Sequence, residues 1–288
     1  MDKKSDYLPL VSVITVCFNA QRYLERAMRS VFAQKYPKIE YIIVDACSTD
    51  ATPRIIEKYR ERIGRLVSEP DQGIYDAQNK GIRLSKGEII CLLNSDDQFY
   101  SPESVAGVVR YFARHDLDLV YGNILNTSPD GAQVYLVKFP RVLKKRFFLR
   151  GPLGHPSTFY KRSCFDKAGF FDLRYKSAAD YDWALRGIYG CGLKAGYLGE
   201  TLSIFQEGGH SKNELDSGKE TRSVINSHFT PTEIFFGRLV NFFAYGDILR
   251  VFARLILFRK GYNALRSAKR KINAYYYRNV KANERTLT

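Results

Sequence analysis

Short apolar runs and amphipathic stretches alternate over the first 120 residues of the chain. The runs 11–17, 40–44 and 89–93 have the length of buried strands and contain β-branched side chains. Residues 24–32 place apolar side chains at positions i, i+3, i+4, i+7 and i+8, which predicts a helix with one buried face. Weaker patterns predict strands at 65–68 and 118–121, and helices opening within 48–53 and covering 74–84 and 102–114. This alternation is typical of an α/β fold, with helices on both faces of a mostly parallel sheet.

The pattern is less regular in the second half of the chain. The turn-forming stretch 126–131 predicts a hairpin between two strands. Three further elements are predicted there: strands at 157–160 and 201–205, and a helix that starts after 177 and ends near 190. The single tryptophan, Trp183, lies in this helix and is expected to pack in the core.

The C-terminal part of the chain differs from the rest in charge. The formal net charge of the chain is +15, and residues 234–288 hold twelve Lys or Arg against two acidic residues. Within this part, residues 248–258 place apolar side chains on one helical face and two arginines opposite. We expect an amphipathic, basic helical tail over 226–288 that makes peripheral contact with an anionic membrane. The alternative is a helix that packs on the main domain with a solvated basic face.

Composition narrows the class of protein. A length of 288 residues suits one large domain or one domain with an appendage. The chain has no stretch of about 18 uncharged residues, and its N-terminus lacks the apolar core of a secretory signal, so a cytoplasmic location is expected. Five cysteines without a C-x-x-C spacing suggest reduced, mostly buried thiols and no zinc site. Neither G-x-G-x-x-G nor a P-loop motif occurs, which argues against the nucleotide sites built on those motifs.

Carboxylates follow two of the predicted strands. Asn94-Ser95-Asp96-Asp97 comes directly after the run 89–93, and Asp45 ends the run 40–44. The carboxyl ends of parallel strands are where open α/β sheets bind their ligands. Hard cations such as Mg²⁺ or Mn²⁺ take oxygen ligands and accompany diphosphates, so the tetrapeptide predicts a site for a metal-bound diphosphate. The alternative is a surface turn, since Asn, Ser and Asp are common turn residues.

These residues resemble the motifs of a family 2 glycosyltransferase with the GT-A fold, of the type that builds bacterial polysaccharides and glycans. The matching segments are 11–19, 43–50, 69–81, 87–97, 155–159, 179–182 and 208–210. The resemblance covers roughly residues 9 to 215 and does not extend to the tail. It implies a GT-A domain over 9–225, with a nucleotide-sugar-binding half over 9–123 and an acceptor half over 124–225.

The resemblance also implies an activity. It is the transfer of a sugar from a nucleotide-sugar donor, expected to be a UDP- or dTDP-sugar, to a glycan or polyprenyl-linked acceptor with inversion. A divalent metal, Mn²⁺ or Mg²⁺, would neutralise the leaving diphosphate. A carboxylate would take the proton of the attacking hydroxyl group. With the basic tail, this places the protein at the inner face of the cytoplasmic membrane, with no nucleic acid as partner.

The family motifs assign roles to individual residues. Asp180 matches the catalytic base, and Asp96 and His210 match positions that contact the metal or the diphosphate. The residues that match the nucleotide pocket are Thr15, Asn19, Asp45, Asp71, Asn79, Asn94 and Ser95. Three more positions have open roles: Asp97 as a second ligand or a helix cap, Asp182 as the base or a solvated acid, and His155 in the acceptor pocket or in a structural role.

Structural alternatives accompany several of these assignments. Asp45 and Asn19 could cap helices, Asp71 could form a turn, Asn79 could lie on a solvated helical face, and His210 could be an ordinary surface residue. Asp180 and Asp182 are two residues apart and cannot face the same way on a helix, so only one of them can be the base.

Two positions depart from the family pattern. Asn94 stands where many members carry the first Asp of a D-x-D motif, and Ala179 stands where an acid often precedes the base. These departures leave open a catalytically inactive relative that binds glycan precursors. A third hypothesis is a nucleic-acid binder that uses the basic tail, which predicts a steep salt dependence of binding.

Overall fold

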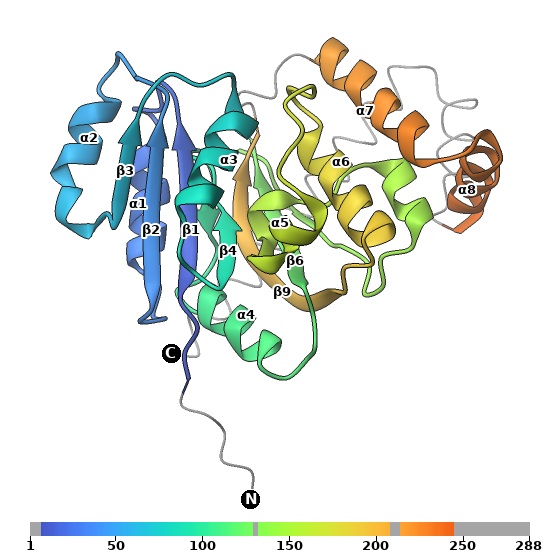
Figure 1. Cartoon of the computed structure of the whole chain (residues 1–288), viewed down its shortest axis with the longest axis horizontal. Helices are drawn as coiled ribbons and strands as arrows, with labels where there is room; N and C mark the ends of the chain where they lie inside the picture. The colour runs from blue at the N-terminus through green and yellow to red at the C-terminus, as the bar shows by residue number, and fades with distance from the viewer. Residues whose placement is uncertain (1–6, 129–131, 208–213, 245–288) are drawn as a thin grey trace, which may run out of the picture.

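The computed structural model of the chain describes residues 7–128, 132–207 and 214–244. Within them, nine strands form one sheet in the order β3-β2-β1-β4-β8-β6-β9-β5, and β7 pairs with β6 (Figure 1). The strands are β1 (Val11–Cys17), β2 (Ile39–Asp45), β3 (Arg65–Ser68), β4 (Ile89–Leu92), β5 (Gln98–Phe99), β6 (Leu119–Thr127), β7 (Val134–Val137), β8 (Thr158–Lys161) and β9 (Ala195–Gln206). The α-helices are α1 (Leu24–Phe32), α2 (Thr52–Lys58), α3 (Ile74–Leu84), α4 (Ser104–Phe112), α5 (Ser163–Ala168), α6 (Ala179–Leu185), α7 (Glu214–His228) and α8 (Pro231–Ala244).

The first half of the sheet is parallel, as the alternating pattern predicts. Strands β3, β2, β1 and β4 all run in the same direction. Their carboxyl ends therefore share one edge of the sheet. Beyond β4 the sheet is mixed, because β8 pairs antiparallel with both β4 and β6 while β9 pairs parallel with β6. The predicted hairpin is confirmed by the antiparallel pairing of β6 with β7.

Two strands are much longer than their apolar runs. The sequence predicts strands at 118–121 and 201–205, whereas β6 and β9 pair with each other from Leu119 to Thr127 and from Ala195 to Gln206. Glycine and asparagine interrupt the apolar pattern of β6, and two glycines interrupt that of β9. Asn123 nevertheless belongs to the sheet, because it pairs with Thr201 of β9 where the register shifts, and its Nδ2 donates to the Gly199 carbonyl at 3.0 Å.

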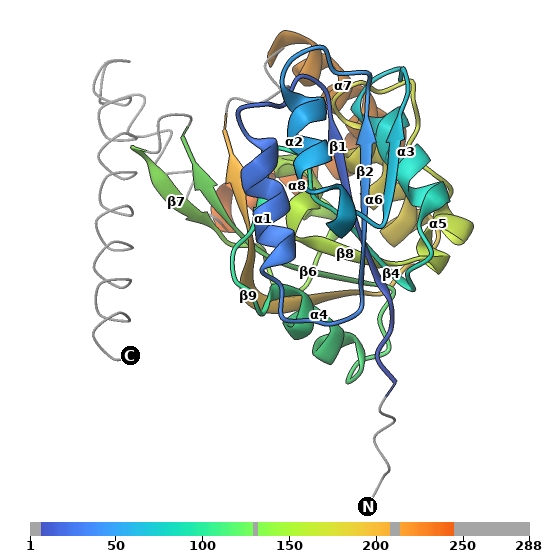
Figure 2. The same cartoon turned by 90° about the vertical axis from the view of Figure 1, so that its left-hand side faces the viewer.

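Each face of the sheet carries its own hydrophobic core. Alternate residues of β1 point to opposite faces, so that Ile14 belongs to the core with α3, α5 and α6, and Val13 to the core with α1, α2 and α4. Figure 2 shows α1 and α3 on opposite sides of β1 and β2. Trp183 is 1% exposed and packs edge-on against Tyr160, which confirms that it is a core residue.

The predictions about the cysteines, membrane-spanning helices and the domain boundary have different outcomes. All five cysteines are free, with Cys17, Cys91 and Cys164 buried and the other two exposed. Among the described residues, no helix combines the length and the apolar character needed to cross a membrane. Helix α7 runs across residue 225, the expected end of the main domain, so the expected division stays a prediction. The amphipathic segment 248–258 lies outside the described residues.

Helix α3 approaches β1 closely because Gly81 faces the sheet. A Cβ atom at Gly81 would lie 2.4 Å from Cγ2 of Ile14, on a stiff β-branched side chain in the core. This close approach brings the first two turns of α3 to the carboxyl edge of the parallel strands.

We predict that Gly81→Ala lowers the free energy of unfolding by about 1–3 kcal/mol, because the added methyl group overpacks the contact with Ile14. Gly218→Ala in α7 is the matched control. Its Cβ would meet nothing within 4 Å, so the better helix propensity of Ala should raise stability by up to about 1 kcal/mol. Denaturant unfolding of both variants measures the two signs. A stabilised Gly81→Ala protein would show that this packing is not tight.

Candidate functional site

The polar residues predicted from the strand ends lie at the carboxyl edge of the parallel strands. Asp45 is the last residue of β2, and Asn94 to Asp97 follow β4. Because β1, β2 and β4 are parallel neighbours, these segments meet at one edge. Helix α6 places Asp180 in its first turn, and the short segment η3 (His155–Ser157) supplies His155.

His155 is the centre of this site. Its Nε2 lies 2.8 Å from Nδ2 of Asn94 and 3.8 Å from a carboxylate oxygen of Asp97. Its Nδ1 lies 3.7 Å from Oδ2 of Asp180. Burial lowers the pKa of His155, but the carboxylates of Asp180 and Asp97 outweigh burial, so the pKa is raised overall. The imidazole thus joins the end of β4 to the start of α6.

Asp97 is an unusual carboxylate. It is 0% exposed, and among the described residues neither of its side-chain oxygens has a hydrogen-bond partner. Burial raises the pKa of Asp97 well above its usual range and the charge of Asp96 adds to the rise, while His155 and the nearby backbone of Asn94 and Gln206 oppose it. A buried carboxylate without donors costs free energy that a bound cation would offset.

Asn94 stands where many members of the family carry an acid. Both the oxygen and the nitrogen of its amide group have partners. Its Oδ1 accepts a hydrogen bond from Nε2 of Gln78 at 3.0 Å, and its Nδ2 faces His155. Asn94 is 8% exposed and close to the buried Asp97. An Asp at this position would add a carboxylate beside Asp96 and Asp97. The amide therefore fits a crowded acidic site. Its neighbour Ser95 is half-buried at the same turn.

Asp180 is held by a contact that the sequence motifs did not suggest. The hydroxyl group of Tyr75 donates to Oδ1 of Asp180 at 2.8 Å. Tyr75 and Gln78 are three residues apart on α3 and so reach the site from one helix face. Their helical spacing was visible in the segment 69–81, but only Asp71 and Asn79 were assigned roles from it.

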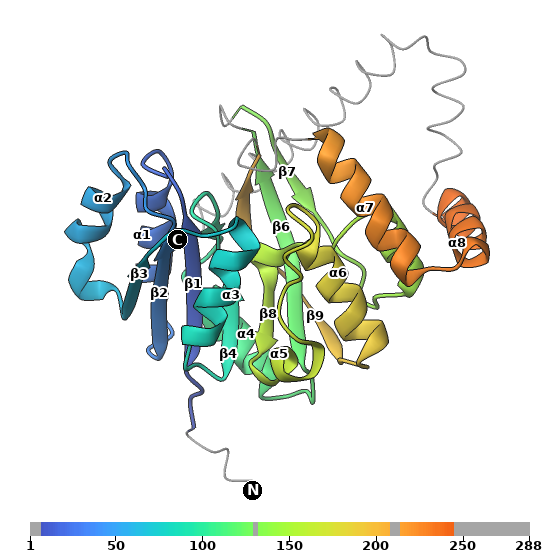
Figure 3. The ribbon, with the colours of Figure 1, turned by 45° about the horizontal axis from the view of Figure 1, so that its top comes forward.

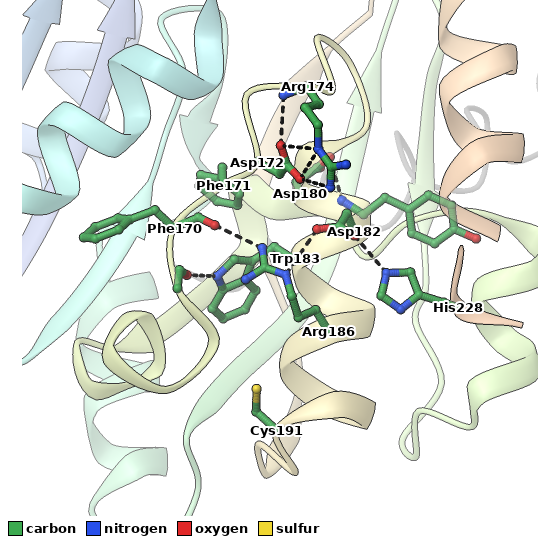
Figure 4. A network of polar contacts seen from close by, with 12 residues as sticks. Phe170, Phe171, Asp172, Arg174, Asp180, Asp182, Trp183, Arg186, Cys191 and His228 are labelled. Atoms are coloured by element: carbon green, nitrogen blue, oxygen red, sulfur yellow. Dashed lines mark hydrogen bonds and ion pairs between the residues drawn. The ribbon is translucent and has the colours of Figure 1, made fainter. Parts of the chain in front are cut away.

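Asp182 points away from this site. It is buried on the other side of α6, where its oxygens contact Nε2 of His228 at 2.8 Å and Nε of Arg186 at 3.3 Å (Figure 4). Burial raises the pKa of Asp182, but these two partners lower it further than burial raises it. Asp182 therefore ties α7 to α6, and Asp180 is the acid of this pair that reaches the site.

Helix α7 also fixes the start of α6. The carboxylate of Glu220 accepts hydrogen bonds from the backbone N–H groups of Lys176 and Ser177, at 2.9 and 2.7 Å. These residues lead directly into α6. The direction in which Asp180 enters the site is thus set by α7 as well as by Tyr75.

Two residues predicted to line the nucleotide pocket, Thr15 and Asn79, are buried and have partners within the protein. Thr15 is 0% exposed, donates to the Leu93 carbonyl at 2.8 Å and accepts from Tyr41, so it joins β1 to β4 inside the sheet. Asn79 is 2% exposed and bonds the backbone N–H and carbonyl of Phe171 at 3.0 and 2.9 Å. Asn79 is therefore not on a solvated helical face. It anchors the loop that leads to α6.

Asp45, Asn19 and Asp71 organise loops at the same edge. Asp45 is 2% exposed and accepts hydrogen bonds from the hydroxyl groups of Ser48 and Ser68. Asn19 is exposed with a φ of 49° and accepts from the Thr49 N–H at 2.9 Å, joining the loop after β1 to the loop after β2. The carboxylate of Asp71 accepts from the Gly73 N–H at 2.8 Å, which forms the turn before α3. None of the three caps a helix through its side chain in these contacts.

The residues at the end of β4 fit a metal ion shared with a diphosphate. Among residues 7–128, 132–207 and 214–244, no group of three or more His, Cys, Asp or Glu side chains could hold a metal ion. Mg²⁺ in particular is often held by one or two carboxylates together with phosphate oxygens and water. Asp96 and the unpartnered oxygens of Asp97 could supply those carboxylates. His210, the other expected ligand, lies outside the described residues.

Comparison with known proteins gives consistent results. Residues 12–175 match the family model described as glycosyl transferase family 2. A PGL/p-HBAD biosynthesis glycosyltransferase of Mycobacterium tuberculosis is 30% identical over 211 residues, which are 72% of this chain and 80% of that protein.

Solved structures share the fold. S. aureus TarS 1-349 in complex with UDP-GlcNAc has a TM-score of 0.62 at 21% identity, over 76% of this chain and 65% of that solved chain, which is less than two thirds of its length. A mannosyltransferase of Pyrobaculum calidifontis in complex with GDP-Man and Mn²⁺ has a TM-score of 0.56 at 22% identity, over 76% of this chain and 62% of that chain.

We predict that Asp97→Asn raises the free energy of unfolding at pH 7 by about 1 kcal/mol or more, because it removes a buried carboxylate without donors. The folded-state pKa of Asp97 lies above its ordinary value of 3.8. The contribution of Asp97 to stability therefore becomes less favourable as the pH rises above about 4, and the advantage of the variant should grow over the same range. Denaturant unfolding between pH 4 and 7 measures it.

Asp182→Asn is the control, and we expect it to change the free energy of unfolding in the opposite direction. Asp182 is also buried but is paired, and its lowered pKa means that it contributes stability above its ordinary value of 3.8. This variant should lose about 1 kcal/mol or more at pH 7. If both variants lose stability, Asp97 has partners that offset its burial.

Proposed function

The chain belongs to glycosyl transferase family 2, and from this we propose that it moves a sugar from a nucleoside diphosphate donor to an acceptor hydroxyl group with inversion and with help from a divalent metal. One observation carries the proposal. A carboxylate suited to act as base, Asp180, and a carboxylate turn suited to a metal-bound diphosphate, Asn94 to Asp97, lie on opposite sides of one imidazole, His155.

In the proposed reaction, the acceptor oxygen attacks the anomeric carbon from the side opposite the diphosphate. The new C–O bond forms as the bond between the anomeric carbon and the diphosphate oxygen breaks, and the bonding electrons leave with the nucleoside diphosphate. Asp180 takes the proton of the hydroxyl group. Tyr75, which donates to one oxygen of Asp180, keeps the carboxylate in place for this transfer.

The charges of the site support this division of roles. A divalent ion bound by Asp96 and Asp97 would supply Lewis-acid stabilisation of the leaving diphosphate. His155, whose pKa is raised by Asp180 and Asp97 against the lowering effect of burial, would balance the negative charge between the two carboxylates. Asn94 and Gln78 hold the ring in this position.

The donor, the acceptor and the location are finer parts of the proposal. A UDP- or dTDP-sugar is the proposed donor, supported by the UDP-GlcNAc complex of TarS, and Mn²⁺ is supported by the Pyrobaculum complex. A glycan or polyprenyl-linked acceptor at the inner face of the cytoplasmic membrane is supported by the basic C-terminal region.

An inactive relative is the rival hypothesis, and the structure weakens both reasons for it. Ala179 is 0% exposed, so an acid at this position would be buried in the core rather than added to the site. Asn94 is a bonded part of the network around His155.

We predict that the chain binds UDP or dTDP more tightly in the presence of Mn²⁺, and that Asp96→Ala abolishes the gain from the metal. Calorimetric titration with UDP, dTDP and GDP, each with and without Mn²⁺, measures it. Metal-independent binding of equal strength in both proteins would remove Asp96 from the metal site. No binding of any nucleotide would contradict the proposed function itself.

We further predict that Asp180→Asn lowers turnover by about 10²- to 10⁴-fold while nucleotide affinity stays within about twofold, because only the proton acceptor is lost. Asp166→Asn, an exposed acid on α5, is the control and should keep full turnover. Release of nucleoside diphosphate with a matching acceptor measures it. Near-normal turnover of Asp180→Asn would exclude Asp180 as the base.

A further inference from the structure

We propose that α8 and the segment 138–150 form one surface that docks on an anionic phospholipid bilayer. We call it the α8 surface. The proposal deepens the proposed location of the enzyme by naming the residues that make the contact, and it rests on that part of the proposed function alone.

Helix α8 exposes an apolar face. Of the ten large hydrophobic side chains that are exposed among the described residues, four lie on this helix: Phe235 at 64%, Phe236 at 57%, Leu239 at 42% and Val240 at 44%. Phe235 and Phe236 pack edge to face on each other. Monomeric soluble proteins rarely gather large apolar side chains in this way unless the face has a partner.

The opposite side of α8 is attached to the domain through η2 (Lys145–Arg150). A Cβ atom at Gly237 would lie 2.4 Å from Cδ1 of Leu149, so the helix backbone sits directly on η2. Lys145 also pairs with Glu233 at 2.8 Å. These contacts fix the direction in which the exposed phenylalanines point.

The segment that carries η2 is strongly basic. Residues 138–150 hold six Lys or Arg and no acidic residue, and they include Val142, which is 68% exposed. On α8 itself Arg238 is exposed. Apolar side chains flanked by cations are the combination that an interfacial helix uses, with the rings at the level of the lipid head groups and the cations near the phosphates.

Charge and apolar character distinguish the bilayer from three other occupants. Residues 245–288 of the same chain hold eleven Lys or Arg against two acidic residues, so they carry the same sign of charge as the α8 surface. A second copy of the chain would also bring its own basic surface to the contact. An anionic bilayer supplies both an apolar phase and negative charge. Nucleic acid supplies phosphates but no apolar phase for Leu239 and Val240.

The α8 surface contacts α6, the helix that carries the proposed base Asp180. Phe148 of η2 stacks on Tyr181 of α6 at a ring distance of 6.2 Å and accepts a hydrogen bond from its hydroxyl group. Tyr181 follows Asp180 directly. Figure 3 shows α8 at the end of the molecule opposite α2. Docking through α8 would therefore put the membrane beside α6 and leave α2 away from it.

The test is flotation of the full-length protein with vesicles of phosphatidylcholine alone or with one quarter phosphatidylglycerol. Wild type should float with the anionic vesicles only. The double variant F235S/F236S and the double variant R141E/K144E should each lower the partition coefficient by about tenfold or more. Leu8→Ser and Arg54→Glu, which change an exposed apolar and an exposed basic residue on other parts of the chain, are the matched controls and should stay within about twofold of wild type.

Other outcomes overturn the proposal. Unchanged flotation of F235S/F236S would assign the contact to another part of the chain. A dimer of the wild type that F235S/F236S converts to a monomer, without flotation, would assign the surface to a second copy. Binding of duplex DNA that both double variants lose, again without flotation, would assign it to nucleic acid.

Two controls separate this test from that of the enzyme. Thermal unfolding of each variant followed by circular dichroism checks that it is folded, and nucleotide titration on the same samples tests the donor site. Loss of flotation with normal nucleotide binding supports the α8 surface. Normal flotation without nucleotide binding would contradict the proposed transferase and leave the α8 surface in place.

Discussion

Two carboxylates on either side of one imidazole are the feature on which the rest of the site depends. Asp97 is buried without hydrogen-bond donors in the described part of the chain, and Asp180 faces the same ring from another helix. Two negative charges so placed repel each other unless a cation lies near them. His155 can provide one positive charge, and a metal ion shared with a diphosphate can provide more. The fold keeps the two carboxylates close to one ring although their negative charges repel each other.

The sheet and the helices act as a frame for this arrangement. The parallel pairing of β1 with β4 delivers Asn94 to Asp97 to the edge of the sheet. Gly81 lets α3 lie close to β1, which brings Gln78 and Tyr75 within reach of Asn94 and Asp180. Asn79 and Asp182 are also part of this frame, because they bond to Phe171 and to His228 and Arg186.

The sequence predicts the part of the site that depends only on which residues follow each strand along the chain. Carboxylates after apolar runs lie at the same edge once the strands are parallel, so Asp45 and Asp96 could be placed from the chain alone. Thr15 and Asn79 could not, because their burial depends on Tyr41 and Phe171, which are far away in the sequence. The strands β6 and β9 were underestimated for a similar reason, since their length comes from pairing with each other across interrupted apolar patterns.

The most direct measurement is a crystal structure of the full-length chain with UDP and Mn²⁺, with the metal located by its anomalous scattering. The account predicts one metal peak in contact with Asp96 or Asp97 and the diphosphate, and an open path from the sugar side of the diphosphate to Asp180. A metal peak or a nucleotide bound away from the carboxyl end of β4 would contradict it.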